Sequence, residues 1–421
     1  MIMRTHVKES EPLFLCGDLG TSSLKAALIS GGGNLLRAER IFYRGEAPYC
    51  WEDAFFTAVE LLLSSRDDLK DRKPDALVLS GNGPTLVPVT GDGPLAPLLW
   101  SYPDSIPGAQ NRLSPVPGEI SSFFLPKIAA FSKLENEAYK KTVMFLTPYE
   151  WLNWRCGAPP FSILPRREYE RYYWDEAQLS LLGIDPKLFP QKIMMGSIAG
   201  TVTRRGPLHG VPIVCAGPDF IMALIGTGTL EEGKCCDRCG SSEGINVCAK
   251  MPLSGGIIGG IGGGGFRVLP HILEGYVNIG IVIPKSGTLL SDYAASIGIP
   301  IEDLPQKIFL QKLDGGLKIL EQLSGAVRAA LDKLEAAGYP AASMTLSGGQ
   351  ALFPQWNQFK ADRFNRVLLE CEIVDAELAG DALVGALALE GKNCTALDLR
   401  QKAAKMIRIR TRYLPRGLEE Q

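Results

Sequence analysis

The chain has 421 residues, 46% of them hydrophobic, which is enough material for two hydrophobic cores and predicts two domains. Its 44 Lys and Arg residues nearly balance its 46 Asp and Glu residues without a long run of one sign, which excludes a nucleic-acid-binding or membrane-surface stripe. No stretch has the apolar length of a membrane span, and the N-terminal residues are polar and charged. We therefore expect a cytoplasmic protein whose partners are small molecules.

The first motif, residues 15–30, reads LCGDLGTSSLKAALIS and predicts two apolar strands joined by a glycine turn. Asp18 could hold the Mg²⁺ that neutralises nucleotide phosphates, and Gly20 would let the backbone approach them closely. Hydroxyl donors and a positive charge follow at Thr21, Ser22, Ser23 and Lys25. An ordinary hairpin also selects Asp and Gly for its turn, so this motif alone leaves both interpretations open.

Beyond this motif, helical and strand patterns alternate along the chain. We expect helices at 52–66, 220–225 and 317–334, and strands at 75–80, 86–89, 211–215 and 344–346. Residues 121–188 are rich in Trp, Tyr and mixed charge, which predicts helices and long loops covering the first domain. The polar, turn-rich segment 201–209 predicts a domain boundary, which gives domains of residues 1–205 and 206–421.

Asp219 follows an apolar strand and Gly217-Pro218, and it precedes the apolar helix expected at 220–225. The backbone amides at a helix start favour the ionised carboxylate, which suits a general base. An ordinary helix cap also selects Asp at this place, so the role of Asp219 depends on the surrounding motifs.

The ten cysteines lack the dense spacing of a disulfide scaffold, and we expect reduced thiols. Cys235, Cys236 and Cys239 are close enough in sequence for a metal site to be considered. Zinc normally takes four ligands, and the three histidines have no paired spacing that would complete the set. The sequence therefore gives a metal role little support.

Four segments, in this order, resemble the FGGY family of carbohydrate kinases, which belongs to the superfamily of actin and the chaperone ATPases. They are DLGTSSLK (18–25), LVLSGNGPTLVPV with PLAPLLW (77–89 and 94–100), CAGPDFIMALIGTGTLEEGK with GSSEG (215–234 and 240–244), and LSGGQALFPQWNQFKADRFNRVLLE (346–370). The resemblance implies an α/β fold of two ribonuclease H-like domains with a cleft between them. It also implies an ATP-dependent carbohydrate kinase that phosphorylates a hydroxyl group of a small sugar, ketose or polyol.

ATP and Mg²⁺ are the cofactors that this resemblance implies. Asp18 would hold the metal within the first phosphate loop, and Asp219 would be the general base and contact the substrate. The other implied contacts are the second phosphate loop at Gly240, Ser241 and Ser242, the adenosine segment at Gly348, Gly349 and Gln350, and the sugar-binding strand and loop at Asn82, Trp100 and Tyr102.

The chain also departs from the family pattern. Relatives commonly show Trp-x-Asp-x-Arg where this chain reads WSYPD at 100–104, and Asn82 replaces the Gln that is frequent in kinases of five-carbon ketoses. The region 293–313 lacks a segment that typical members carry. These departures leave the sugar and its reacting hydroxyl open, and they keep as an alternative a non-catalytic sensor that binds nucleotide or sugar. A homodimer is also left open.

Overall fold

The structure is a computed structural model that describes residues 11–64, 72–102, 120–240, 242–251, 260–261 and 266–416. The chain folds into two compact units. The first comprises Met1–Met222 and Gly380–Lys402, and the second comprises Ala223–Ala379 and Ala403–Gln421. The boundary expected at residues 205 and 206 lies inside the first unit, because β11 (Pro212–Pro218) pairs with β4 (Ala76–Gly81) of that unit.

A six-stranded sheet in the order β10-β11-β4-β1-β2-β3 forms the centre of the first unit. Its remaining strands are β1 (Leu13–Leu19), β2 (Ser23–Ser30), β3 (Leu35–Phe42) and β10 (Ile198–Thr201). Strands β1, β4 and β11 are parallel, whereas the other neighbours pair antiparallel. Every residue of β1 and β4 is buried, as expected for strands that are covered on both faces.

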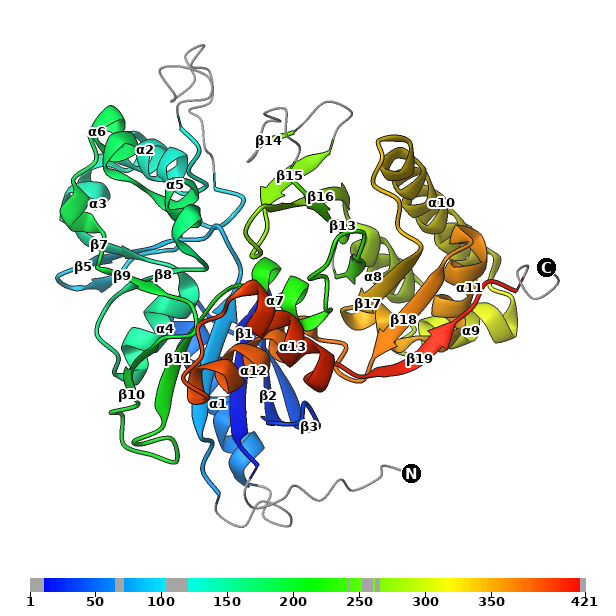
Figure 1. The fold of residues 1–421 in the computed structure, drawn as a ribbon, viewed down its shortest axis with the longest axis horizontal. Helices are drawn as coiled ribbons and strands as arrows, with labels where there is room; N and C mark the ends of the chain where they lie inside the picture. The colour runs from blue at the N-terminus through cyan, green and yellow to red at the C-terminus, as the bar shows by residue number, and fades with distance from the viewer. Residues whose placement is uncertain are drawn as a thin grey trace. The chain divides into compact units, whose positions relative to one another are not determined.

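Helices cover both faces of this sheet (Figure 1). The helices that lie in or enter the first unit are α1 (Tyr49–Ser64), α2 (Leu125–Leu134), α3 (Asn136–Lys141), α4 (Pro148–Cys156), α5 (Glu170–Tyr173), α6 (Glu176–Leu182), α7 (Asp219–Gly226), α12 (Ala376–Leu389) and α13 (Ala396–Met406). Phe14 and Val78 face α12, where a Cβ on Gly385 would lie 2.9 Å from each of them. Gly81 points to the opposite face and abuts Tyr149 of α4.

Two small sheets complete the first unit. They are β6-β5-β7, formed by β5 (Val87–Thr90), β6 (Gly93–Pro94) and β7 (Thr142–Leu146), and the parallel pair β8 (Ser162–Leu164) and β9 (Lys192–Met194). Residues 121–188 thus form helices as expected, but they also contribute two short strands that the sequence did not indicate.

The second unit repeats the strand order of the first. Its sheet runs β14-β15-β16-β13-β12-β17-β18-β19, built from β12 (Cys235–Cys239), β13 (Glu243–Lys250), β14 (Gly260–Ile261), β15 (Arg267–Pro270), β16 (Tyr276–Ile283), β17 (Ser343–Ser347), β18 (Val367–Cys371) and β19 (Ile409–Tyr413). A hairpin, β12–β13, is followed in space by two parallel strands and an antiparallel edge strand, as in the first unit. The similarity between the halves is one of topology rather than of residues.

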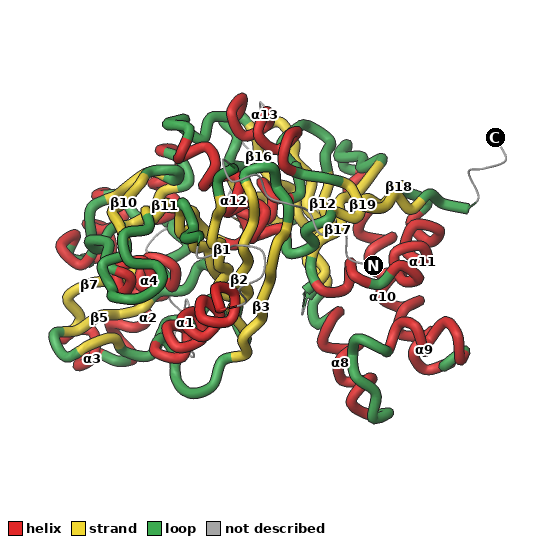
Figure 2. The backbone as a smooth tube through the Cα atoms, turned by 90° about the horizontal axis from the view of Figure 1, so that it is seen from below, coloured by secondary structure: helices red, strands yellow, loops and turns green. Residues whose placement is uncertain are grey.

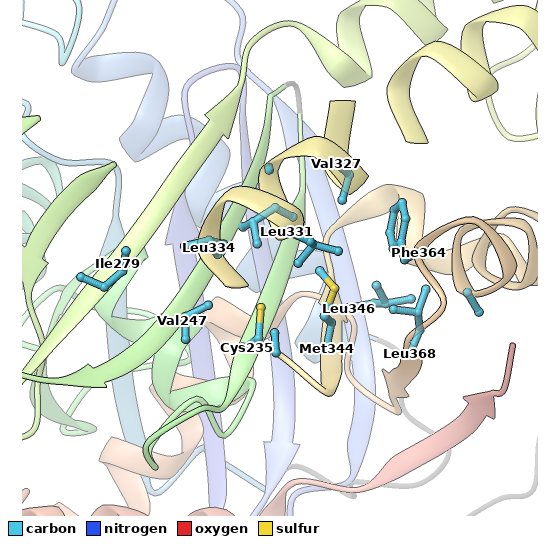
Figure 3. Close-up of a cluster of buried hydrophobic side chains, with 14 of the residues drawn as sticks. Cys235, Val247, Ile279, Val327, Leu331, Leu334, Met344, Leu346, Phe364 and Leu368 are labelled. Carbon is cyan, nitrogen blue, oxygen red and sulfur yellow. The ribbon is translucent and has the colours of Figure 1, made fainter. Parts of the chain in front are cut away.

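Helices α8 (Ser286–Ser296), α9 (Leu304–Gln311), α10 (Asp314–Ala336) and α11 (Pro354–Phe364) belong to the second unit and gather together (Figure 2). Val327, Leu331 and Leu334 of α10 pack onto sheet residues such as Val247 and Met344 (Figure 3). The helical spacing expected at 317–334 is therefore confirmed, and its apolar face is what joins α10 to the sheet. Among the described residues, no helix has both the length and the apolar character that crossing a membrane requires.

Helix α4 begins with a buried capping box that anchors it in the first unit. The Glu150 carboxylate accepts hydrogen bonds from the backbone N–H groups of Thr147 at 2.8 Å and Ile163 at 2.6 Å, and Glu150 is 1% exposed. Burial raises the pKa of the Glu150 carboxyl to about 7, although these hydrogen bonds act in the opposite direction.

The Glu150→Ala variant should lose about 2–5 kcal/mol of unfolding free energy, because two buried N–H groups lose their acceptor. Urea unfolding followed by tryptophan fluorescence measures this loss. The matched control is Glu137→Ala, which removes a carboxylate whose side chain is 81% exposed and should change stability little. Equal effects of the two substitutions would contradict the structural role of Glu150.

Candidate active site

Three of the candidate residues lie at the carboxyl ends of adjacent parallel strands. Asp18 is near the end of β1, Asn82 follows β4, and Asp219 follows β11. The register pairs Asp18 with Ser80 and Pro218 with Gly81. Neighbouring strands lie about 4.8 Å apart, so the ends of β1 and β11 are about 10 Å apart across β4. The two carboxylates are thus brought to one edge of one sheet, where open α/β sheets bind their ligands.

The turn between β1 and β2 is tight because Gly20 has no side chain. Its N–H donates to the carbonyl oxygen of Ser23 at 3.1 Å, and a Cβ on Gly20 would lie 2.9 Å from that oxygen. Thr21 and Ser22 at the tip are exposed, whereas Ser23 is buried. The tip therefore offers two hydroxyl groups to an incoming ligand, and the Ser23 side chain is turned inward.

Asp18 is a buried carboxylate, 3% exposed, with the Lys25 ammonium 3.5 Å from its Oδ2. Burial and then Asp18 raise the pKa of the Tyr43 hydroxyl, so Tyr43 also lies close to this carboxylate. The sequence did not single out Tyr43. A carboxylate and nearby hydroxyls are the hard oxygen donors that Mg²⁺ prefers, so the residues present fit this ion.

A second buried acid, Asp381 of α12, lies under the same strands. Its Oδ2 accepts a hydrogen bond from the Ser80 hydroxyl at 2.9 Å, and Asp381 is fully buried. Burial and then Asp381 raise the pKa of the Cys16 thiol in β1. The sequence analysis did not identify Asp381, although an Asp within the apolar run ELAGDALVGALAL indicated a buried polar role.

Asp219 begins α7, as expected, and is partly exposed. Its Oδ1 accepts a hydrogen bond from the N–H of Phe220 at 2.6 Å. Helix α7 is held close to α12, because a Cβ on Gly380 would overlap the carbonyl oxygen of Met222. Gly380 therefore sets the position of the helix that carries Asp219, and the sequence analysis did not anticipate this contact.

The sugar-loop residues are partly engaged within the protein. Asn82 is buried, and its Nδ2 donates to the carbonyl oxygen of Leu19 at 3.1 Å. The backbone N–H of Trp100 donates to Thr85 Oγ1 at 3.0 Å, which holds the loop beside the turn that follows β4. The Trp100 side chain is 55% exposed and is free to cover a ligand.

Hydrogen bonds of Tyr102 and Lys127 stabilise this loop. The Tyr102 hydroxyl donates to Glu135 Oε1 at 2.9 Å, and burial together with this hydrogen bond raises the pKa of Tyr102 to about 12. The buried Lys127 ammonium donates to the carbonyl oxygens of Trp100 at 3.0 Å and Tyr102 at 3.2 Å. Lys127 was missed, although a lysine in the apolar run FLPKIAAF indicated a buried role. Asp104 lies outside the described residues.

In the second unit, the turn between β12 and β13 lies against the adenosine segment. Gly348 has φ +88°, and a Cβ on it would lie 2.5 Å from the carbonyl oxygen of Cys239. Gln350 Nε2 donates to the carbonyl oxygen of Gly240 at 3.3 Å. Gly349 starts a 3-10 turn, and a Cβ on it would meet no atom within 4 Å.

The hydroxyl of Ser242 accepts a hydrogen bond from the N–H of Lys285 at 3.3 Å, whereas Ser241 lies outside the described residues. The two nucleotide segments predicted from sequence in this half are therefore neighbours in the fold.

The cysteines of β12 do not form a common site. Side chains alternate along β12, so Cys235 and Cys239 point to the face of the sheet that carries the hydrophobic core. Cys236 points to the other face. All ten cysteines are free thiols, and nine of them are buried, with Cys394 half-buried.

Comparison with known proteins agrees with this architecture. No family model matches the chain. It is 21% identical to xylulose kinase from Bacillus subtilis over 441 aligned residues, which cover 88% of this chain and 87% of that protein. The ligand-bound xylulose kinase of Lactobacillus acidophilus superposes with a TM-score of 0.76 at 14% identity, over 96% of this chain and 94% of that one. The gluconate kinase of Lactobacillus acidophilus gives 0.75 at 13% identity, over 97% and 94%.

The chain therefore has the two-sheet α/β fold of these solved sugar kinases, as expected. The similarity to xylulose kinases in sequence and in fold supports the resemblance to FGGY carbohydrate kinases that the four motifs carry.

The Gly380→Ala variant should displace α7 from α12 and lower both the melting temperature and the catalytic rate, because no space exists for the added methyl group. The control is Gly325→Ala in α10, where a Cβ meets nothing within 4 Å. That change should stabilise the protein by up to about 1 kcal/mol through helix propensity. Thermal unfolding and steady-state kinetics of both variants test the contact, and a stable, fully active Gly380→Ala protein would refute it.

Proposed function

We propose that the protein transfers the γ-phosphoryl group of ATP to a hydroxyl group of a small sugar, ketose or polyol, with Asp219 as general base. The observation that carries this proposal is the alignment of Asp18, Asn82 and Asp219 at the ends of three adjacent parallel strands. Phosphoryl transfer requires positioning, charge neutralisation and a proton acceptor near the attacking oxygen. The edge of this sheet supplies a residue suited to each requirement.

In the proposed step, the Asp219 carboxylate accepts the proton of the attacking sugar hydroxyl. A bond forms between that oxygen and the γ-phosphorus, while the bond from the γ-phosphorus to the bridging oxygen breaks and ADP leaves. The partly exposed position of Asp219 at the start of α7 leaves its carboxylate accessible to a substrate hydroxyl. Asp18, with the hydroxyls of Thr21 and Ser22, would hold Mg²⁺, which when bound neutralises charge on the phosphates.

In the second unit, Gly240 to Ser242 and Gly348 to Gln350 are proposed to bind the nucleotide. Their direct contacts through Gly348 and Gln350 support a single nucleotide-binding surface within this unit. Ser241 and Gly349 remain part of this proposal, and the absence of a Cβ at Gly349 leaves open backbone for the ligand.

A sensor that binds nucleotide or sugar without turnover is a second candidate. The Nδ2 of Asn82 and the hydroxyl of Tyr102 already bond to Leu19 and Glu135, which leaves fewer groups to bind a sugar and favours the sensor. The general-base position of Asp219 favours the kinase. An assay of ATP consumption against pentuloses, hexuloses, polyols and aldonates separates the two. The panel includes xylulose and gluconate, the substrates named for the relatives.

The Asp219→Asn variant should lose about 10²- to 10⁴-fold in kcat, because the amide cannot accept the proton. Its affinity for Mg·ADP, measured by calorimetry, should not change. Asp92→Asn, a change at an exposed turn of the same unit, is the matched control and should leave turnover intact. An unchanged kcat in Asp219→Asn would show that Asp219 is not the general base. Nucleotide binding by the wild type without turnover of any compound in the panel would support the sensor.

A further inference from the structure

A cluster of charged groups is buried in the second unit, and the function described above does not use it. Lys360 of α11 places its ammonium 3.0 Å from Asp237 Oδ2 and 3.3 Å from Cys239 Sγ, and it also donates to Glu243 Oε1. Lys360 is 1% exposed, and Asp237 and Glu243 are fully buried. We call these four residues the Lys360 cluster.

The cluster lies at the base of the turn proposed to bind phosphate. Asp237 and Cys239 lie in β12 before this turn, and Glu243 opens β13 immediately after it. Cys239 and Glu243 are directly paired across the hairpin. The ammonium of Lys360 therefore bonds to both strands at the point where they enter the turn.

Lys360 also connects this turn to the adenosine segment. It lies on the helix that follows Gly348 to Gln350, and its ammonium is 5.1 Å from the centre of the Trp356 ring. Trp356 Nε1 donates to Gln350 Oε1 at 3.2 Å, and Gln350 Nε2 donates in turn to the carbonyl oxygen of Gly240. A continuous chain of contacts thus runs from the cluster through α11 back to the turn.

Stability alone does not account for such a cluster. Removing an ammonium and two carboxylates from water costs several kcal/mol per ion, and well-packed apolar residues of similar volume are often equally or more stable. The neighbouring core, with Cys235, Ile245 and Leu346, is apolar and continuous. Charges placed beside this apolar core favour a role in fixing geometry.

The Lys360 cluster also contains the donor atoms of a metal site. The ligand atoms of Asp237, Cys239 and Glu243 lie within 4.8 Å of one another, which is close enough to hold one. The ammonium of Lys360 already contacts all three of them. The ammonium therefore occupies the place of a cation, and a divalent ion would have to displace it.

We propose that Lys360 is a positioning residue for nucleotide binding, which acts through Asp237 and Glu243 to hold the Gly240 to Ser242 turn against the adenosine segment. This inference rests on the proposed nucleotide-binding role of the turn, and it identifies what keeps the turn in place. Lys360 itself does not touch the nucleotide.

The charge of the cluster couples the turn to pH. Burial, and then Asp237, raise the pKa of the Glu243 carboxyl to about 7, while Lys360 acts in the opposite direction. Burial opposes the charge of Lys360, but Asp237, Cys239 and Glu243 outweigh it and place the pKa of Lys360 well above its usual value. The titratable groups that face Glu243 are Asp237 and Cys239 from β12 and Lys360 from α11, and β16 pairs Ile283 with it.

The first test is the double variant Lys360→Met with Asp237→Asn. It removes one charge of each sign, and the remaining Glu243 carboxyl, whose pKa burial raises, takes up a proton, so that no ion is left uncompensated and the protein can fold. We expect a cooperative melting transition and Mg·ADP affinity reduced about tenfold or more by calorimetry, because the charged hydrogen bonds that hold the turn are lost. The KM for ATP should rise, while kcat at saturating ATP should remain close to that of the wild type. Lys318→Met, an exposed lysine in the same unit, is the control and should bind as the wild type does.

A folded double variant with wild-type affinity for Mg·ADP would overturn the inference. The wild type could bind Mg·ADP without phosphorylating any sugar, and the double variant could bind Mg·ADP more weakly. That pair of results would refute only the kinase proposal. Absence of Mg·ADP binding by the wild type would refute both.

The second test uses Glu243→Gln, which keeps the shape of the protonated acid. As the pH rises through about 7, Glu243 in the wild type ionises, its hydrogen bond with the Lys360 ammonium becomes a charged one that holds the turn more firmly, and Mg·ADP affinity should rise several-fold. The phosphates of ADP also titrate near this range, so the difference between wild type and Glu243→Gln isolates the contribution of Glu243. We expect this increase to be absent in Glu243→Gln. Identical pH profiles for the two proteins would count against the cluster acting on the nucleotide.

Discussion

The parallel pairing of β4 with β1 on one side and β11 on the other is the constraint on which the candidate site depends. It places the ends of three strands, distant in sequence, side by side, and it fixes Asp18 and Asp219 on either side of the turn that follows β4. The pairing is held by strands that are buried along their whole length and by close helix packing at Gly385 and Gly81. A shift of one residue in register would move the Asp18 side chain to the opposite face of the sheet.

The same topology in the second unit carries different side chains at its turn. The hairpin β12–β13 occupies the place that β1–β2 has in the first unit, and Arg238 pairs with Ser347 as Asp18 pairs with Ser80. One hairpin therefore presents an acid with exposed hydroxyls, and the other presents a glycine turn that is held from below by buried charges. Two copies of one arrangement thus present different groups, and the difference depends on the residues at the turns and not on the strands.

The sequence predicted the parts of the fold that depend on local pattern. The amphipathic spacing of α10, the apolar runs of β4 and β11, and the glycine turn at Gly20 were all readable. The short strands β7 and β8 were not, because three to five residues carry too little periodicity to be distinguished from loop.

The sequence predicted only part of the candidate site, because local motifs can be recognised in a sequence and contacts between distant residues cannot. Asp18 and Asp219 stand in motifs whose turn and helix-start chemistry is local. Lys127, Asp381 and Lys360 act through partners far away in the sequence, so their roles appear only when the fold brings those partners together. Each was visible as a charge within an apolar run, but a single sequence does not say which carbonyl, hydroxyl or carboxylate such a charge will meet.

The positions of the cysteines allow thiol labelling to measure local unfolding of the protein. Nine cysteines are sealed inside the two units, and burial raises the pKa of thiols such as Cys16, Cys215 and Cys235, which keeps them protonated and unreactive in the native state. Cys394 is the one half-buried thiol, and burial raises its pKa to about 12 as well. The sulfurs on the central strands of each sheet would be modified only when those strands separate, so the order of labelling records which unit loosens before the other.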